Sequence, residues 1–189
     1  VATMVMGLAA CGSQPAANTP SNESNAGGNQ NSTEELIKVG IINNNPNESG
    51  YRTANDKDLK AMFTEENGYL ASFSYGEKNE EQVSAAQKLI QDGVDYLLLS
   101  AADTAGWDSV LKDAQDAGIR VILFDRTINA DPSLYEASIV SDMNKEGQTA
   151  VDWLKKQGLS EYKIIHIQGK MGTAAQQGRS AAMDEAVKN

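Results

Sequence analysis

Residues 94–126 of the chain run VDYLLLSAADTAGWDSVLKDAQDAGIRVILFDR and carry the clearest signal of the fold class. Two short and nearly continuous apolar runs, residues 94–100 and 119–124, flank a segment whose apolar residues recur every three or four positions. This period predicts a helix over about 106–117, closed by Gly118. Continuous apolar runs are typical of parallel strands that helices cover on both faces. The stretch therefore predicts a strand–helix–strand unit.

The same alternation continues on both sides of this unit. Further strands are predicted at 37–42, 69–75, 136–140 and 163–167, and further helices within 49–67, at 79–92, at 143–157 and from 173 onward. In the first helix Leu59, Met62 and Phe63 are spaced as a buried face, and Gly68 follows as its cap. The pattern predicts an α/β fold with a doubly wound parallel sheet, for which we expect the strand order 2-1-3-4-5. Such sheets bind ligands beyond the carboxyl ends of their strands.

The first 35 residues differ from the rest of the chain. Residues 1–11 are apolar and end in Leu8-Ala9-Ala10-Cys11, which resembles the lipobox of bacterial lipoproteins; no charged segment precedes them, so we expect the natural chain to begin upstream. Residues 12–33 contain no Leu, Ile, Val, Met or aromatic residue, so residues 12–35 are expected to form a disordered polar tether. The resemblance implies an exported protein, on the outer face of the cell membrane or periplasmic, with a lipid on Cys11.

Composition argues against several classes of partner. The net charge is −10 and no run of Lys or Arg occurs, which disfavours nucleic acid. One cysteine and one histidine exclude an internal disulfide and a zinc site of the usual type, and His166 is predicted to pack within a strand. Neither of the glycine-rich phosphate-binding spacings occurs after the first strand, so no cofactor is expected.

Polar side chains follow two of the predicted strands. Residues 43–52, NNNPNESGYR, come after the first strand, and Asp125 and Arg126 end the fourth. A carboxylate and a guanidinium side by side suit the hydroxyl groups of a small polyol, and the ring of Tyr51 suits the C–H face of a sugar. The alternative is that Asp125 caps a turn and pairs with a neighbouring cation.

Two tryptophans and one further acid are candidates for the same site. Asp103 follows the third strand and is expected to cap the next helix rather than to touch a ligand. Trp107, at the start of that helix, is placed within reach of the cleft, whereas Trp153 is expected to pack in a core.

Residues 48–52 (ESGYR), 103–107 (DTAGW) and 123–128 (LFDRTI) together resemble the ribose-type periplasmic sugar-binding family, closest to its galactofuranose-binding branch. Ser141-Asp142, Ile167-Gln168-Gly169, Gly172-Thr173 and Gly178-Arg179 extend the resemblance. It implies two α/β lobes that trap a monosaccharide for an ABC permease, with residues 36–141 in the first lobe and 142–189 beginning the second. It places Glu48, Ser49, Gly50, Tyr51, Arg52, Asp125 and Arg126 on the first side of the cleft and Arg179 on the second. Tyr51 stands where members of that branch have tryptophan.

Competing functions are a ligand-sensing effector domain of a transcriptional regulator, a sugar-sensing partner of a membrane receptor, and a glycosidase. The lipobox and tether disfavour the regulator, and an aspartate beside an arginine suits hydrogen bonding better than acid catalysis, so no enzymatic activity is expected. Because the second lobe is incomplete, residues 1–189 alone are expected to bind sugar weakly. They are also expected to aggregate through Trp153, Ile164, Ile165 and Ile167.

Overall fold

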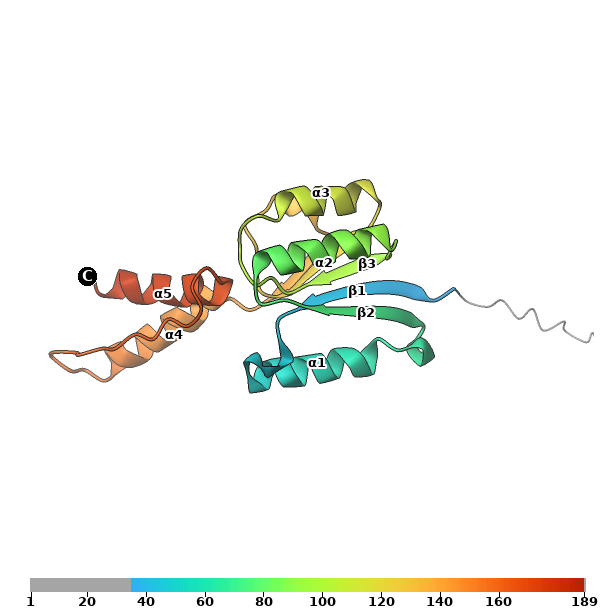
Figure 1. The fold of residues 1–189 in the computed structure, drawn as a ribbon. Helices are drawn as coiled ribbons and strands as arrows, with labels where there is room; N and C mark the ends of the chain where they lie inside the picture. Colours follow the sequence, from blue (N-terminus) through green and yellow to red (C-terminus); the bar gives the residue numbers. More distant parts are fainter. Residues whose placement is uncertain (1–34, 189) are drawn as a thin grey trace, which may run out of the picture. The chain divides into compact units, whose positions relative to one another are not determined.

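A computed structural model describes residues 35–188, which belong to a single unit of the fold (Figure 1). The strands are β1 (Ile37–Asn43), β2 (Tyr69–Tyr75), β3 (Tyr96–Leu99), β4 (Arg120–Asp125) and β5 (Ala137–Val140). They form a five-stranded sheet in the order β2-β1-β3-β4-β5, and every neighbouring pair is parallel. The predicted fold class and strand order are confirmed.

Helices cover both faces of this sheet. The helices of the described part are α1 (Gly50–Met62), α2 (Asn79–Gln91), α3 (Asp108–Asp116), α4 (Met143–Lys156) and α5 (Ala174–Ala186), with short 3-10 turns η1 (Pro46–Glu48), η2 (Glu65–Asn67) and η3 (Pro132–Leu134). Figure 1 shows α2 and α3 on one face and α1 on the other. This layering leaves the carboxyl ends of the strands as a common edge, where the loops after β1, β3 and β4 meet.

The main core lies between the sheet and helices α2 and α3. Leu97 and Leu99 of β3 point into it, while Tyr96 and Leu98 alternate to the other face, as the pleat requires. Trp107 is fully buried in this core, and its indole N–H donates to the carbonyl of Asp103 at 2.9 Å. The expectation that Trp107 approaches the cleft is therefore wrong, because the ring fills the space where α3 begins.

Helix α1 turns inward a face on which Arg52 and Asp56 lie beside the half-buried Leu59 and Phe63. Met62 is exposed, whereas Arg52 and Asp56 are buried. Both buried charges have partners, and Asp56 accepts hydrogen bonds from Lys60 at 2.8 Å and from the hydroxyl of Tyr75. A charge is buried at tolerable cost only when it is paired, and these pairs let α1 present a polar face to the sheet.

A buried glutamine fixes the ends of three strands. The side-chain amide of Gln82 in α2 donates to the carbonyl groups of Asn43, Gly76 and Ser100 at 3.4, 3.2 and 3.2 Å, and its oxygen accepts from the backbone of Ala102 at 2.7 Å. Each buried group thereby finds a partner where the sheet ladder stops. The sequence does not predict this role for Gln82, because a single glutamine on a helix carries no distinguishing pattern.

The last part of the chain departs from two expectations. Residues 163–167 are not a strand, because among residues 35–188 no neighbouring strand is placed to pair with their backbone, and His166 is only half-buried. Trp153 of α4 is 60% exposed, so its expected core position is wrong. Ile164, Ile165 and Ile167 are exposed as well, and aggregation through this surface stays a prediction.

Candidate functional site

A buried arginine organises the polar cluster at the carboxyl edge of the sheet. Arg52 is 2% exposed and donates from Nε to Glu48 at 2.9 Å and from Nη2 to Asp125 at 2.5 Å. Its Nη1 donates to Asn43 Oδ1 and Ser100 Oγ, both at 3.1 Å. Four of the five guanidinium N–H groups are therefore engaged. Arg52 joins two carboxylates that are 77 positions apart in sequence, at residues 48 and 125.

Asp125 ends β4 in a strained turn. Its φ is 63°, and among the described residues it alone is a non-glycine in the left-handed region. The N–H of Arg126 donates to the carbonyl of Phe124 at 2.7 Å and closes a three-residue turn around Asp125. Strain of this kind persists where surrounding bonds impose it, as those from Arg52 and Ser100 do here. Asp125 thus fits both alternatives: it shapes a turn and pairs with a cation, and its carboxylate lies in the cluster.

Arg126 closes the cluster on its outer side. Its Nη2 lies 3.1 and 3.2 Å from the two oxygens of Glu48, and its Nη1 donates to Asn44 Oδ1 at 3.1 Å. Asn44 is buried and bonds the carbonyl of Ser100, so the arginine rests on a fixed partner. Glu48 consequently bridges two arginines while a third of its side chain stays exposed. This arrangement keeps carboxylate and guanidinium groups in place at the open edge of the sheet.

The other residues of the predicted motif begin α1. Ser49 is its N-cap, with Oγ accepting from the backbone of Arg52 at 3.2 Å. Gly50 has open space where a side chain would start. Tyr51 is 55% exposed, and partial burial together with the nearby Asp125 carboxylate raises its pKa. The capping sequence therefore leaves an exposed aromatic ring beside the acidic and basic groups.

The electrostatics of Glu48 give a pH-dependent contribution to stability. Partial burial works to raise its pKa, but hydrogen bonds from Arg52 and Arg126 outweigh this and hold the pKa below its ordinary value of 4.5. A lowered pKa in the folded state stabilises the protein above about pH 4.5, and this contribution is lost as the pH falls through the folded pKa.

We expect the difference in free energy of unfolding between the parent and Glu48→Gln to be largest near neutral pH and to shrink below about pH 4.5. Urea denaturation at several pH values between 7 and 3 measures it. Asp56 contributes in the same sense at lower pH, because burial works to raise its pKa but hydrogen bonds from Lys60 and Tyr75 hold the pKa below its ordinary value of 3.8. Asp56→Asn is therefore measured alongside Glu48→Gln. A difference in free energy of unfolding between the parent and Glu48→Gln that does not change with pH would contradict the lowered pKa of Glu48.

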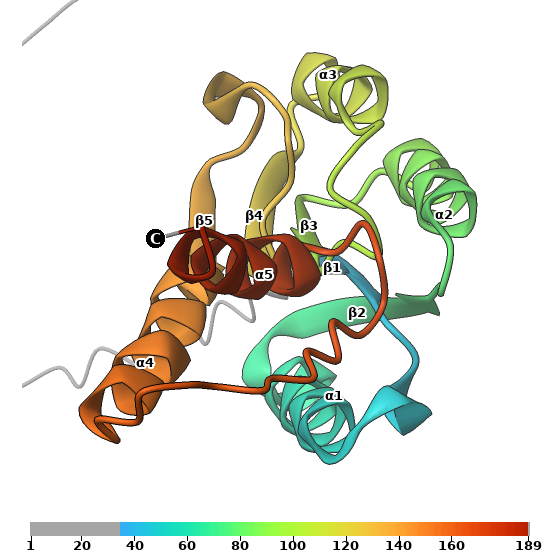
Figure 2. The same cartoon turned by 90° about the vertical axis from the view of Figure 1, so that its left-hand side faces the viewer.

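Arg179 does not join this cluster. It lies on α5, where Nε and Nη2 contact Glu146 of α4 at 2.8 and 2.7 Å. The segment that leads into α5 nevertheless contacts the first part of the fold, because the N–H of Thr104 donates to the carbonyl of Gly172 at 3.3 Å. Figure 2 shows α5 crossing in front of the carboxyl edge of the sheet. Asp103 bonds the backbone of Ala105 at 3.2 Å and does not cap α3, so that expectation is wrong.

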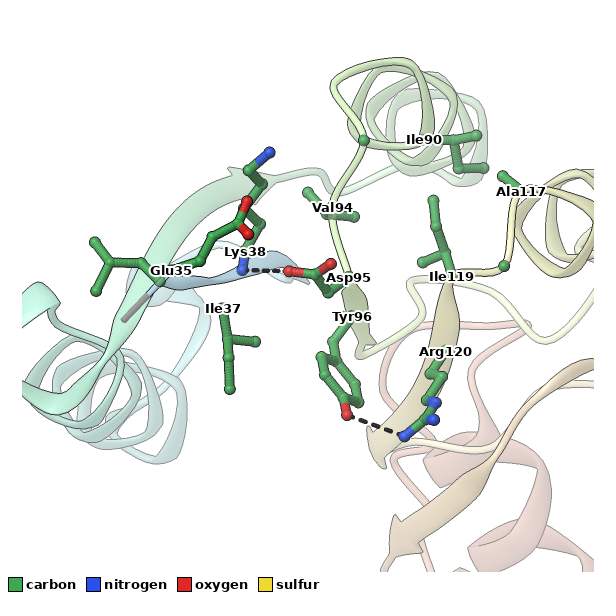
Figure 3. A pocket seen from close by; sticks show the side chains of 13 residues that line it. Glu35, Ile37, Lys38, Ile90, Val94, Asp95, Tyr96, Ala117, Ile119 and Arg120 are labelled. Atoms are coloured by element: carbon green, nitrogen blue, oxygen red, sulfur yellow. Dashed lines mark hydrogen bonds between the residues drawn. The ribbon is translucent and has the colours of Figure 1, made fainter. Parts of the chain in front are cut away.

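One hollow in the described part lies away from this cluster. It measures about 650 Å³ and sits at the amino ends of β1, β3 and β4 (Figure 3). Two hydrogen bonds join polar groups of its lining: Asp95 accepts from the backbone of Lys38 at 2.8 Å, and Arg120 donates to the hydroxyl of Tyr96 at 3.1 Å. Ligands of open α/β sheets bind at the opposite edge, so we do not assign this hollow to the site.

A parallel doubly wound sheet with a polar cluster at its carboxyl edge has the architecture of α/β domains that bind ligands at that edge. The chain belongs to the periplasmic binding protein domain family, whose pattern matches residues 39–189.

Named relatives bind sugars. The galactofuranose-binding protein of Escherichia coli is 34% identical over 145 residues, which are 75% of this chain and 45% of that protein. The fructose import binding protein of Bifidobacterium longum is 32% identical, and the match covers 82% of this chain and 45% of that protein. The chain thus spans about half the length of the curated relatives that it matches.

Solved structures agree with this relationship. A crystal structure of a galactofuranose-binding protein superposes with a TM-score of 0.74 at 33% identity, covering 81% of this chain and 52% of that one. The arabinose-binding component from Shewanella sp. ANA-3, bound to L-arabinofuranose, gives 0.72 at 32% identity, covering 80% and 50%. The predicted resemblance to sugar-binding proteins, including the galactofuranose-binding branch, is confirmed.

Two features of the cluster were missed from sequence. Asn43 and Asn44 stand in the polar segment that was singled out, yet they are buried and support the arginines. Ser100 ends an apolar strand, and its hydroxyl contacts both Arg52 and Asp125. A polar residue at the carboxyl end of a buried strand was the available signal for Ser100.

Within residues 35–188, no helix combines the length and the apolar character that crossing a membrane requires.

Proposed function

We propose that this chain contributes the first lobe, and the beginning of the second, of an extracytoplasmic binding protein that captures a monosaccharide and delivers it to an ABC importer. The observation that supports this most is the cluster of Glu48, Asp125 and Arg126, held by Arg52 at the carboxyl edge of the sheet. The sugar relatives at 34% and 32% identity support the same ligand class.

Each residue has a distinct part in this proposal. Asp125 accepts hydrogen bonds from two neighbouring hydroxyls, Arg126 donates to ring or hydroxyl oxygens, and Glu48 offers its exposed oxygen edge. The exposed ring of Tyr51 packs on the C–H face of the sugar. Arg52 acts through the carboxylates that it holds, because one of its N–H groups at most is left for a ligand.

The electrostatics favour binding over hydrolysis. A glycosidase needs one carboxylic acid whose pKa is raised so that it can donate a proton. Burial alone would raise the pKa of Glu48, but hydrogen bonds from its two arginine partners lower it. Asp125 shares the same cations. Glu48 is therefore arranged as a hydrogen-bond acceptor and not as a proton donor.

A thermal-shift screen of the full-length natural chain tests the proposal. The panel is D-galactose, L-arabinose and D-fructose, whose solutions include furanose forms, with D-ribose as a fourth member and sucrose as a control. A sugar at 100 times its dissociation constant adds about 2.7 kcal/mol to the stability, which raises the melting temperature by several degrees. No shift with any of the four monosaccharides would contradict the proposed ligand class.

Membrane attachment is a separate part of the proposal. Leu8-Ala9-Ala10-Cys11 matches a lipobox, but these residues lie outside the part that the structure describes. We propose that a lipid on Cys11 anchors the mature protein to the outer face of the membrane and that residues 12–35 act as the tether.

Cys11→Ala is expected to move the protein from the membrane pellet to the soluble exported fraction, because a lipid anchor supplies its membrane affinity through buried acyl chains. Fractionation followed by immunoblotting measures the distribution. Ser13→Ala, two positions further on, is the matched control and should stay in the pellet. A Cys11→Ala protein that pellets as the parent does would refute the anchor.

A further inference from the structure

The pairing of Arg179 with Glu146 is specific in its geometry. The guanidinium approaches the carboxylate side-on, with Nε at 2.8 Å and Nη2 at 2.7 Å from the same oxygen, Oε2. The two residues come from different helices, α5 and α4, at positions 33 apart in sequence. Two donors on one edge of a planar group fix its direction as well as its distance.

The backbone beneath this pair is fixed by two glycines that face each other's helix. A β-carbon on Gly147 would lie 2.5 Å from the carbonyl oxygen of Arg179, and one on Gly178 would lie 2.6 Å from the β-carbon of Met143. No side chain fits at either distance, so α4 and α5 touch backbone to backbone here. Glu146 directly precedes Gly147, and Arg179 directly follows Gly178. The close contact of the two helix backbones therefore fixes the positions from which both side chains extend.

One edge of Arg179 stays open. Its Nη1 makes no hydrogen bond to another residue of the described part, and the side chain is 53% exposed. Arg126 in the first part of the fold is more enclosed, because Glu48 holds its Nη2, Asn44 accepts from its Nη1, and its side chain is 11% exposed. Arg52 shows the opposite case, because four of its five N–H groups are engaged in a buried network. A guanidinium held on one edge and open on the other is suited to receiving a ligand.

We propose that Glu146 is a positioning residue for sugar binding, which holds Arg179 so that its free edge points to the ligand. This inference rests on the proposed function, in which Arg179 contacts the sugar. Glu146 itself does not touch the sugar. Without it, the long side chain of Arg179 must be ordered when the sugar binds, and ordering one such side chain weakens binding by roughly 2- to 12-fold.

A double-mutant cycle in the full-length natural chain tests this inference. The parent, Glu146→Gln, Arg179→Ala and the double variant are titrated calorimetrically with whichever of D-galactose, L-arabinose and D-fructose binds the parent most tightly. We expect Glu146→Gln to weaken binding by roughly 2- to 12-fold in the parent and to have no effect in the Arg179→Ala background. Asp152→Asn is the matched control on the same helix, since Asp152 bonds only Gln148 among its neighbours in the described part, and it should bind as the parent does.

The outcomes separate this inference from the proposal beneath it. If Arg179→Ala weakens binding but Glu146→Gln does not, Glu146 has no positioning role and the proposed function stands. Glu146 likewise has no positioning role if the Glu146→Gln loss persists in the Arg179→Ala background. If Arg179→Ala binds as the parent does, Arg179 leaves the proposed site and this inference fails with it. Absence of binding by the parent to all of the sugars would overturn both.

Discussion

Replacing Asp125 by alanine is expected to lower the affinity for the sugar by roughly 30-fold or more, because two ligand hydroxyls lose their acceptor and each unpaired donor costs about 1–3 kcal/mol. Calorimetric titration of the full-length natural chain measures the loss. The structure adds a second effect, since Asp125 also accepts from Arg52 and Ser100. Alanine therefore leaves a buried guanidinium short of a partner, and some loss of stability is expected along with the loss of affinity.

Asp125→Asn separates the two effects. Asparagine tolerates the left-handed backbone that Asp125 adopts at φ 63°, so the turn at the end of β4 is retained. Its amide offers one acceptor oxygen in place of a carboxylate that serves both the arginine and the ligand. We expect Asp125→Asn to fold with parent-like circular dichroism and still to bind sugar at least about tenfold more weakly. Unchanged affinity in both variants would remove Asp125 from the binding site.

The layered sheet could be predicted because each of its signals is local. Apolar runs at 94–100 and 119–124, with a helical period between them, define one strand–helix–strand unit from a short window of sequence. The apolar run at 163–167 gives the same local signal, but the strand that it predicts does not form. A strand also needs a neighbour to pair its backbone, and a partner strand is a property of the whole sheet and not of five residues.

The position of the polar cluster could be predicted from sequence, but the hydrogen bonds within it could not. Residues 48–52 and 125–126 stood out because polar groups at the carboxyl ends of parallel strands meet at one edge. The different roles of Arg52 and Arg126 could not be predicted, because both residues are arginines in similar motifs. Burial decides them: Arg52 is enclosed and holds the carboxylates, whereas Arg126 lies at the outer side.

Arg52 should accordingly carry a large share of the stability of the site. Arg52→Met keeps much of the side-chain volume and removes the charge, so that the Asp125 carboxylate loses its 2.5 Å partner and Asn43 and Ser100 each lose a donor. Breaking a buried ion pair by removing one member costs about 3–5 kcal/mol. For a domain of this size we expect the melting temperature to fall by roughly 6–20 °C.

Differential scanning calorimetry measures this fall, and Arg120→Met supplies the comparison. Arg120 is an exposed arginine at the amino end of β4, bonded to the hydroxyl of Tyr96, and its loss should change stability by no more than about 0.5 kcal/mol. Arg52→Lys distinguishes charge from shape, because an ammonium keeps the charge but cannot reach Glu48, Asn43 and Asp125 together as the planar guanidinium does. If Arg52→Lys has the same melting temperature as the parent, charge alone holds the carboxylates. If Arg52→Met melts no lower than Arg120→Met, Arg52 is not the residue that organises this site.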